Sequence, residues 1–256
     1  MKAHSKNILI AVMLGLAVFL ASSEPKAQQT SISIQVNASQ MDPLMIDSET
    51  RPGVFIEIAQ AAAAIARIKF APKFYPWLRA MKNMERDSTQ VIVGISRTPP
   101  REKKYIWIMH LIDMDVGFIS LSRKINSYKE GKGVNSIGFW RGTNYHNEVK
   151  RNGMTNIRPF KTNAEAGRDR SIELLELGRL SSWYGDINEF RYRWQQHAKN
   201  KSQHLYVGKP IYSDSIWLAA NLQFSKEIAH RLKSAMAKLK KSEKYEKIIT
   251  KYFGAK

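Results

Sequence analysis

The sequence has no cysteine among its 256 residues. This absence excludes disulfide bridges, thiolate zinc sites, iron–sulfur clusters, cysteine nucleophiles and the lipid-modified cysteine of bacterial lipoproteins. Acidic side chains are scarce as well, because 22 Asp and Glu stand against 41 Lys and Arg and leave a formal net charge of +19. Such a charge fits an acidic partner, an anionic surface or simple solubility, and it does not choose among them.

Long hydrophobic runs are also missing, with one exception near the first residue. Lys2 and Lys6 precede an apolar stretch over residues 8–20, and small residues follow it. The stretch is shorter than the roughly 20 residues that a helix needs to span a bilayer, so a membrane anchor is the weaker interpretation. We therefore expect residues 1–27 to be a secretory signal peptide, cleaved after Ser23 or Ala27, and the mature chain to be exported.

Patterns typical of strands and helices alternate along the rest of the chain, and 43% hydrophobic residues allow a sizeable core. We expect strands at 31–36, 69–75, 90–95, 116–122, 135–139, near 157, at 180–184 and at 215–220. Helices are expected at 53–68, 77–86 and 164–177, and beginning at 144, 187, 225 and 242. The alternation indicates two α/β units, the second starting after a connection at 129–133.

The most informative stretch runs from Gly94 to Tyr105. A buried strand is expected to end here, and Thr98 and Pro99 have the character of a helix N-cap and first helical residue. Arg101 would then lie in the first turn, where its guanidinium could bind a carboxylate, with the Ser96 hydroxyl as a second donor. An exposed arginine with a structural role is the alternative.

Two later stretches combine a strand end with a helix start. After the turn at Gly142, the backbone N–H groups of Thr143, Asn144 and Tyr145 would form a cradle for an anion. Asp186 ends a later strand and caps the next helix, at the carboxyl edge where open α/β sheets bind small molecules. An ordinary capped helix is the alternative at both places.

Together with other segments, these stretches resemble the polar amino-acid type of bacterial extracytoplasmic solute-binding proteins, family 3, which serve ABC importers. The resemblance runs from about residue 32 to 254, through 52–58, 75–80, 94–102, 141–143, 175–179 and 245–254. It implies an α/β, two-lobed periplasmic binding protein-like fold of type II, with the lobes joined by a two-strand hinge. We place lobe 1 at 28–113 and 214–256, and lobe 2 at 114–213.

The resemblance also implies a binding site and partners. Arg101 would hold a ligand carboxylate, helped by Ser96 and by the backbone around Thr143 and Asn144, and Asp186 would hold the ammonium group. Trp77 would lie against the ligand or be buried in the core. The expected role is the capture of an amino acid or similar small polar solute in the periplasm, by a monomer that docks on the permease of an ABC transporter in the inner membrane. No catalysis, cofactor, metal or nucleic acid is expected.

The chain also departs from the family pattern. Ser39, Gln40 and Met41 stand where the family often has an aromatic ligand contact, and Arg97 would add a second cation to the pocket if it faced inward. Three rival functions remain. They are a dehydratase-like enzyme, which would need a buried acid or base over its substrate, a ligand sensor, and a polyanion or membrane-surface binder. The last is suggested by a basic helix over 225–241, for which a solvated face is the better interpretation. The six histidines show neither metal spacing nor a catalytic constellation.

Overall fold

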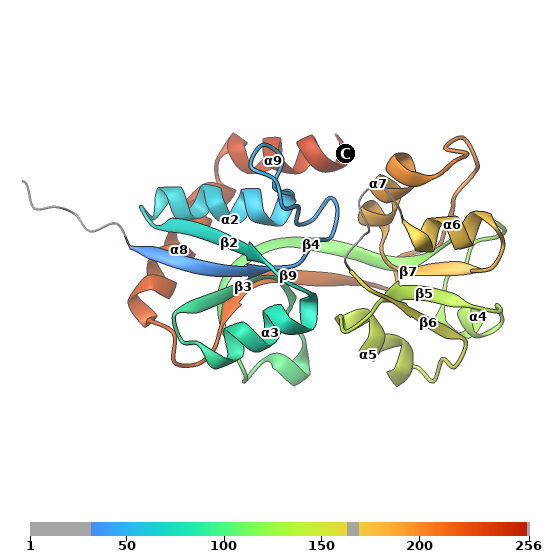
Figure 1. The fold of residues 1–256 in the computed structure, drawn as a ribbon, viewed down its shortest axis with the longest axis horizontal. Helices are drawn as coiled ribbons and strands as arrows, with labels where there is room; N and C mark the ends of the chain where they lie inside the picture. Colours follow the sequence, from blue (N-terminus) through green and yellow to red (C-terminus); the bar gives the residue numbers. More distant parts are fainter. Residues whose placement is uncertain (1–31, 163–168, 255–256) are drawn as a thin grey trace, which may run out of the picture. The chain divides into compact units, whose positions relative to one another are not determined.

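The computed structural model describes residues 32–162 and 169–254, and the expected signal peptide lies outside them. The strands are β1 (Ser33–Ala38), β2 (Lys69–Phe74), β3 (Gln90–Ser96), β4 (Ile106–Ser120), β5 (Ile137–Trp140), β6 (Ile157–Phe160), β7 (Ser182–Asp186), β8 (Tyr206–Val207) and β9 (Tyr212–Ala220). Among the described residues they form one nine-stranded sheet in the order β2-β1-β3-β9-β4-β7-β5-β6, with β8 beside β4 (Figure 1).

The first half of this sheet carries helices on both faces. β1 pairs in parallel with β2 and β3, and α2 (Val54–Ile65) and α3 (Trp77–Arg86) supply the crossovers that parallel strands need. Alternate β3 residues point to opposite faces, so Val91 and Val93 join the core beneath α2 while Ile92 packs against α3. The strand is irregular between Val93 and Ile95, and Ile95 therefore lies on the α3 side as well. The helices α8 (Lys226–Lys240) and α9 (Glu243–Phe253) pack on α2. The lysines of α8 are exposed.

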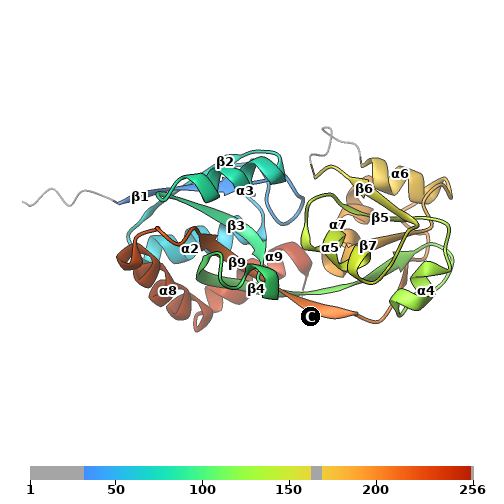
Figure 2. The same cartoon turned by 90° about the horizontal axis from the view of Figure 1, so that it is seen from below.

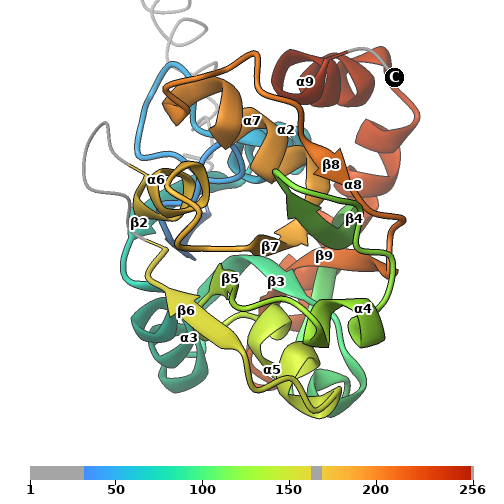
Figure 3. The same cartoon turned by 90° about the vertical axis from the view of Figure 1, so that its right-hand side faces the viewer.

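The second half repeats this plan with shorter strands. β5 pairs in parallel with β6 and β7. Figure 3 shows α5 (Asn144–Arg151) on one side of these strands and α6 (Arg170–Glu176) and α7 (Ile187–His197) on the other. The large aromatic side chains Trp183, Tyr184, Phe190 and Trp194 are fully buried here.

A buried charge cluster lies within this second half. Arg193 of α7 bonds Asp169 Oδ2 through Nη1 and Glu189 Oε1 through Nε, both at 2.5 Å. Its guanidinium also lies 4.6 Å from the ring centroids of Trp140 and of Trp183. One cation thus serves two buried carboxylates and is enclosed by aromatic rings, which satisfies its charge away from water.

Two long strands join the halves. β4 and β9 pair with each other in antiparallel fashion, while β9 also pairs with β3 and β4 with β7 (Figure 2). The expected lobe boundaries at 113/114 and 213/214 fall inside these strands, where Met114 and Asp214 are direct partners. The boundaries themselves stay predictions.

The two strands that join the halves are longer than the sequence pattern predicted. β4 begins at Ile106 rather than 116, and β9 begins at Tyr212 rather than 215. Irregularities in the β4–β9 register, between Trp107 and Met109 and between His110 and Ile112, disturb the period-two pattern by which a strand is recognised.

Other differences are local. The helix expected from Thr98 is a single 3-10 turn, Pro99–Arg101, without a side-chain cap. The helix expected at 164–177 is α6, and residues 164–168 lie outside the described part of the chain. The short α4 (Tyr128–Lys132) and β8 were not predicted. In the described ranges, no helix has the length and apolar character needed to cross a membrane.

Candidate functional site

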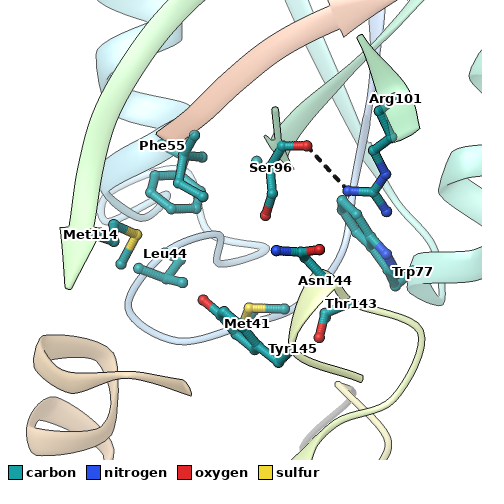
Figure 4. Close-up of a pocket in the computed structure, with 12 residues that line it drawn as sticks. Met41, Leu44, Phe55, Trp77, Ser96, Arg101, Met114, Thr143, Asn144 and Tyr145 are labelled. Atoms are coloured by element: carbon teal, nitrogen blue, oxygen red, sulfur yellow. Dashed lines mark hydrogen bonds between the residues drawn. The ribbon is translucent and has the colours of Figure 1, made fainter. Parts of the chain in front are cut away.

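Both halves of the sheet contribute to one pocket (Figure 4). Five of the six predicted binding residues line it, namely Trp77, Ser96, Arg101, Thr143 and Asn144. The cavity volume is about 30 Å³, enough for one or two water molecules. An amino acid is larger, so its entry would require the two sides of the pocket to separate.

Arg101 reaches the pocket from the 3-10 turn that follows β3. Its Nη1 donates to the backbone oxygen of Ser96 at 3.2 Å, which ties the guanidinium to the end of the strand. Burial lowers the pKa of Arg101, although a guanidinium stays protonated in proteins. The structure therefore holds a partly buried, charged fork of donors at the wall of the pocket.

Ser96 is used differently from the expectation. Its hydroxyl donates to Asp214 Oδ2 at 2.7 Å, and both residues are buried, at 8% and 3% exposure. Burial raises the pKa of Asp214 to about 6, while the bond from Ser96 and the charge of Arg101 act in the opposite direction. Because a hydroxyl has a single proton, this bond leaves Ser96 only lone pairs to offer a ligand. The sequence had predicted a donor here and had not identified Asp214.

Trp77 and Asn144 connect the two sides of the pocket. Trp77 Nε1 donates to the backbone oxygen of Gly142 at 3.1 Å, so this side chain both lines the pocket and is buried. Asn144 Nδ2 donates to the hydroxyl of Tyr212 on β9 at 3.3 Å. The expected tight turn is present, because Gly142 has φ +79° and a Cβ there would lie 2.8 Å from Leu78.

The start of α5 has the geometry of the predicted anion cradle. Thr143 is the N-cap residue, but its hydroxyl donates to the Trp140 backbone oxygen at 2.7 Å and makes no capping bond. The first backbone N–H groups of a helix have no partner within the helix, and they carry the positive end of its dipole. An anionic group could therefore be bound between this helix start and Arg101.

Asp186, the sixth predicted residue, does not line this pocket. It lines a separate cavity of about 630 Å³ with Asp113, Asp115 and Lys240, and the two cavities share Met114. As expected, it caps α7, since it accepts from Glu189 N at 2.6 Å. Its Oδ2 is buried with no hydrogen-bond partner among the described residues. Burial raises the pKa of this carboxyl well above its usual range.

Several pocket residues were missed because their positions depend on distant contacts. The missed side chains are Leu44, Phe55, Met114 and Ile216, and together with Met41 and Tyr145 they give the pocket a largely apolar wall. Phe55 supplies an aromatic ring from α2, although the segment after β1 has none. The sequence signal for Phe55 was the segment 52–58, which had been used only for the family resemblance.

Arg97 lies outside the pocket. Its Nε donates to Glu102 Oε2 at 2.8 Å, and its guanidinium lies over the rings of Trp107 and Trp217, at 5.4 and 4.7 Å from their centroids. The outward orientation is thus the observed one. Ser39 and Gln40 do not line the pocket either; Ser39 shares a hydrogen bond with Thr162 and Gln40 donates to Asp42. Across residues 32–162 and 169–254, no cluster of His, Asp and Glu is arranged to hold a metal ion.

Comparisons with known proteins were made for both sequence and fold. The family model of the bacterial extracellular solute-binding proteins, family 3, matches residues 34–255. No curated protein sequence gave a match. An ancestral arginine-binding protein bound to arginine is 19% identical with a TM-score of 0.72, and the match covers 87% of this chain and 98% of that one.

Two further solved structures are similar in fold. The GluR0 ligand-binding core from Nostoc punctiforme, in complex with L-glutamate, is 12% identical with a TM-score of 0.73, covering 87% of this chain and all (100%) of that one. A histidine kinase sensor domain with similarity to periplasmic binding proteins is 16% identical with a TM-score of 0.73, covering 88% and 96%.

These likenesses establish the fold, which is the mixed α/β, type II periplasmic binding protein-like fold that the sequence predicted. The family model extends over nearly all of the described residues. The chain therefore belongs to the bacterial extracellular solute-binding proteins, family 3.

Proposed function

We propose that the chain captures an amino acid or similar small polar solute between its two lobes and delivers it to an ABC importer. In this proposal residues 1–27 are removed on export, and the mature protein acts in the periplasm as a monomer that docks on the permease in the inner membrane. The single observation that carries the proposal is the pocket itself. Arg101 and Trp77 from one lobe line it together with Thr143 and Asn144 from the other.

The chemistry of these residues suits a carboxylate. Arg101 offers parallel N–H donors, and the start of α5 adds backbone donors from the opposite side. A carboxylate between them would exchange its hydration for fixed, charge-assisted bonds, which offset the cost of desolvation. Because the two sets of donors belong to different lobes, such a ligand would stabilise the closed arrangement over an open one.

A thermal-melting panel tests the proposal. The mature chain would be heated with amino acids, polyamines, and mono- and dicarboxylates, because a ligand that binds only the folded state raises the midpoint. We expect at least one amino acid to raise it. A panel without any such effect would refute the proposal.

Two neighbouring arginines, Arg97 and Arg101, provide a matched pair for this test. Arg101→Ala should weaken binding of the best amino acid at least about thirtyfold by calorimetry, since a charge pair in the pocket would lose one partner. Arg97→Ala removes the same charge from a side chain outside the pocket and should leave affinity nearly unchanged. Equal losses in both variants would contradict the role of Arg101.

Some members of the family are enzymes or sensors, and one observation keeps an enzymatic function as a second candidate. Asp214 is a buried acid beside the pocket, bonded to Ser96, and its pKa of about 6 suits proton transfer near neutral pH. Proton NMR of the bound panel members after prolonged incubation distinguishes the functions. A binding protein returns its ligand unchanged, whereas a dehydratase converts it.

A further inference from the structure

A buried acid that the family resemblance does not predict lies beside the pocket. Asp214 lies on β9 directly opposite Met114 of β4, and it is two residues before Ile216. Residues two apart on a strand share a face of the sheet, and both Met114 and Ile216 line the pocket. The carboxylate of Asp214 is therefore on the pocket side of the sheet, immediately behind the Ser96 hydroxyl that it holds.

The hydrogen bond between these residues fixes what Ser96 can do. A carboxylate accepts hydrogen bonds and does not donate them, so the proton of the 2.7 Å bond belongs to Ser96. Ser96 Oγ then turns lone pairs toward the pocket, and the negative charge behind it strengthens it as an acceptor. The complementary ligand group is an N–H donor, above all an ammonium group.

The rest of the pocket wall leaves an ammonium group few other partners. Apart from Ser96, the side-chain oxygens of this wall belong to Thr143, Asn144 and Tyr145, none of which carries a charge or is hydrogen-bonded to a carboxylate of the described residues. Asp186 lines the other cavity, and one of its oxygens already caps α7. Burying an ammonium group is costly unless its charge is compensated, and Ser96 is the lining acceptor that is hydrogen-bonded to a carboxylate.

We propose that Asp214, acting through Ser96, is a positioning residue that makes the pocket selective for a ligand bearing an amino group next to its carboxylate. This inference rests on the proposed function and deepens it. Arg101 binds the carboxylate, the Ser96 oxygen accepts from the ammonium group, and the side chain of the ligand lies against the apolar wall formed by Met41, Leu44 and Phe55. The preferred ligands are then amino acids with apolar side chains.

The test compares matched pairs of ligands. L-leucine, L-methionine, L-phenylalanine, L-glutamine, L-arginine and L-glutamate would each be titrated beside the corresponding 2-hydroxy acid, which keeps the carboxylate and side chain and lacks the ammonium group. The wild type should bind the apolar amino acids most tightly. Its affinity for each of these amino acids should be about tenfold or more higher than its affinity for the corresponding 2-hydroxy acid.

Asp214→Asn keeps the shape of the side chain and removes its charge, and it should reduce this preference about tenfold. Asp113→Asn is the matched control, since it is the same change on the neighbouring strand, at a residue outside the pocket. Ser96→Ala and the double variant, which carries both Ser96→Ala and Asp214→Asn, complete a double-mutant cycle. If Asp214 acts through Ser96, the double variant should lose no more preference than Ser96→Ala alone.

A second measurement covers the case in which Asp214→Asn does not fold. Carbon-13 NMR of the Asp214 carboxyl in the wild type follows its titration, and a bound amino acid should lower its pKa more than the 2-hydroxy acid does. Three results would overturn the inference while the proposed function stands. They are an unchanged preference in Asp214→Asn, loss of the preference in Asp186→Asn instead, or equal effects of the two ligands on the Asp214 titration. If the wild type binds no amino acid, the proposed function fails and the inference fails with it.

Discussion

The carboxylates that are buried in the described part of the chain fall into two contrasting pairs. Asp169 and Glu189 share the guanidinium of Arg193, whereas Asp186 and Asp214 have no ion-pair partner among the described residues. Burial acts against ionisation of Asp169, but Arg193 and Ser171 outweigh it and hold the pKa of that carboxyl below its usual range. At Glu189 burial outweighs the same guanidinium and raises the pKa, so the cation partner and not the direction of the pKa shift is what the first pair shares. Burial dominates at Asp186 and Asp214 and raises their pKa values.

This contrast separates structural charge from charge that is available for binding. The first pair is already neutralised inside the second half of the sheet. Asp186 lines one of the two cavities that share Met114, and Asp214 lies behind Ser96 of the other. Each has one oxygen committed to a single hydrogen bond. Buried acids with raised pKa values and no cation partner are typical of functional sites.

Arg193→Met should produce the largest effect. It leaves two buried carboxylates without their cation, and removal of one partner from a buried ionic cluster costs about 3–5 kcal/mol of the free energy of unfolding. Urea denaturation of the wild type and of Arg193→Met measures this loss of stability. Arg191→Met, on the exposed side of the same helix, is the control and should change stability by less than about 0.5 kcal/mol. If both variants lost similarly little stability, Asp169 and Glu189 would not depend on Arg193, and the contrast with Asp214 would disappear.

Asp214→Asn should change how stability depends on pH. With a folded pKa of about 6, Asp214 retains a proton between pH 4 and 6 that the unfolded chain has released. Its stabilising contribution is thus complete below the unfolded pKa and is lost as the pH rises through 6. Asn does not titrate, so the stability of the variant relative to the wild type should rise by about 1–3 kcal/mol between pH 4 and pH 7.

Urea denaturation at pH 4, 5, 6 and 7 measures this difference. The charged or titratable groups that act on Asp214 are Arg101, Tyr145, Tyr212, Glu148 and Asp113. Tyr145 and Tyr212 stay neutral in this range, because burial raises their pKa values. The variant retains all five groups, so their own contributions to the pH dependence cancel to first order when the two proteins are compared. A relative stability that is constant with pH would show that Asp214 resembles the paired acids.

Replacing Asp186 should have the smallest effect. Asp186→Asn keeps an oxygen that can accept from Glu189 N, whereas Asp186→Ala removes the cap of α7. We expect the Ala variant to be about 1 kcal/mol less stable than the Asn variant, as measured by thermal or urea unfolding. Equal stabilities would mean that the capping hydrogen bond of Asp186 contributes little to the stability of the protein.

The sequence predicted most of the architecture because each strand and helix left a local signal. The apolar run at 90–95 and the helix start at Trp77 are both found close to their expected places. The spacing from Ser96 to Arg101 likewise brought two residues to one pocket. These features depend on neighbours in the chain, which a sequence displays directly.

The rest of the site depends on contacts between distant residues. Asp214 stands among Tyr212, Ser213 and Ser215 in a polar stretch typical of a loop, and it is buried because β9 pairs with β4. The donor direction of Ser96 is set by this same acid, 118 positions away. The assignment of Asp186 to a different cavity likewise depends on distant residues, because Ile249, Phe253 and Gly254 near the end of the chain line that cavity with it, and no local pattern records this.

The direct pairing of Met114 with Asp214 means that residues 115–213 form a single insertion between two neighbouring positions of the sheet. The segment between them leaves the first half of the sheet and returns to it at one place, so its two ends are neighbours. A segment of this kind can be gained, lost or exchanged as an insertion with little disturbance to its host. This segment could thus be exchanged between relatives at these two positions, which would carry Asn144 and Asp186 to a new host chain while Arg101 and Asp214 stay behind.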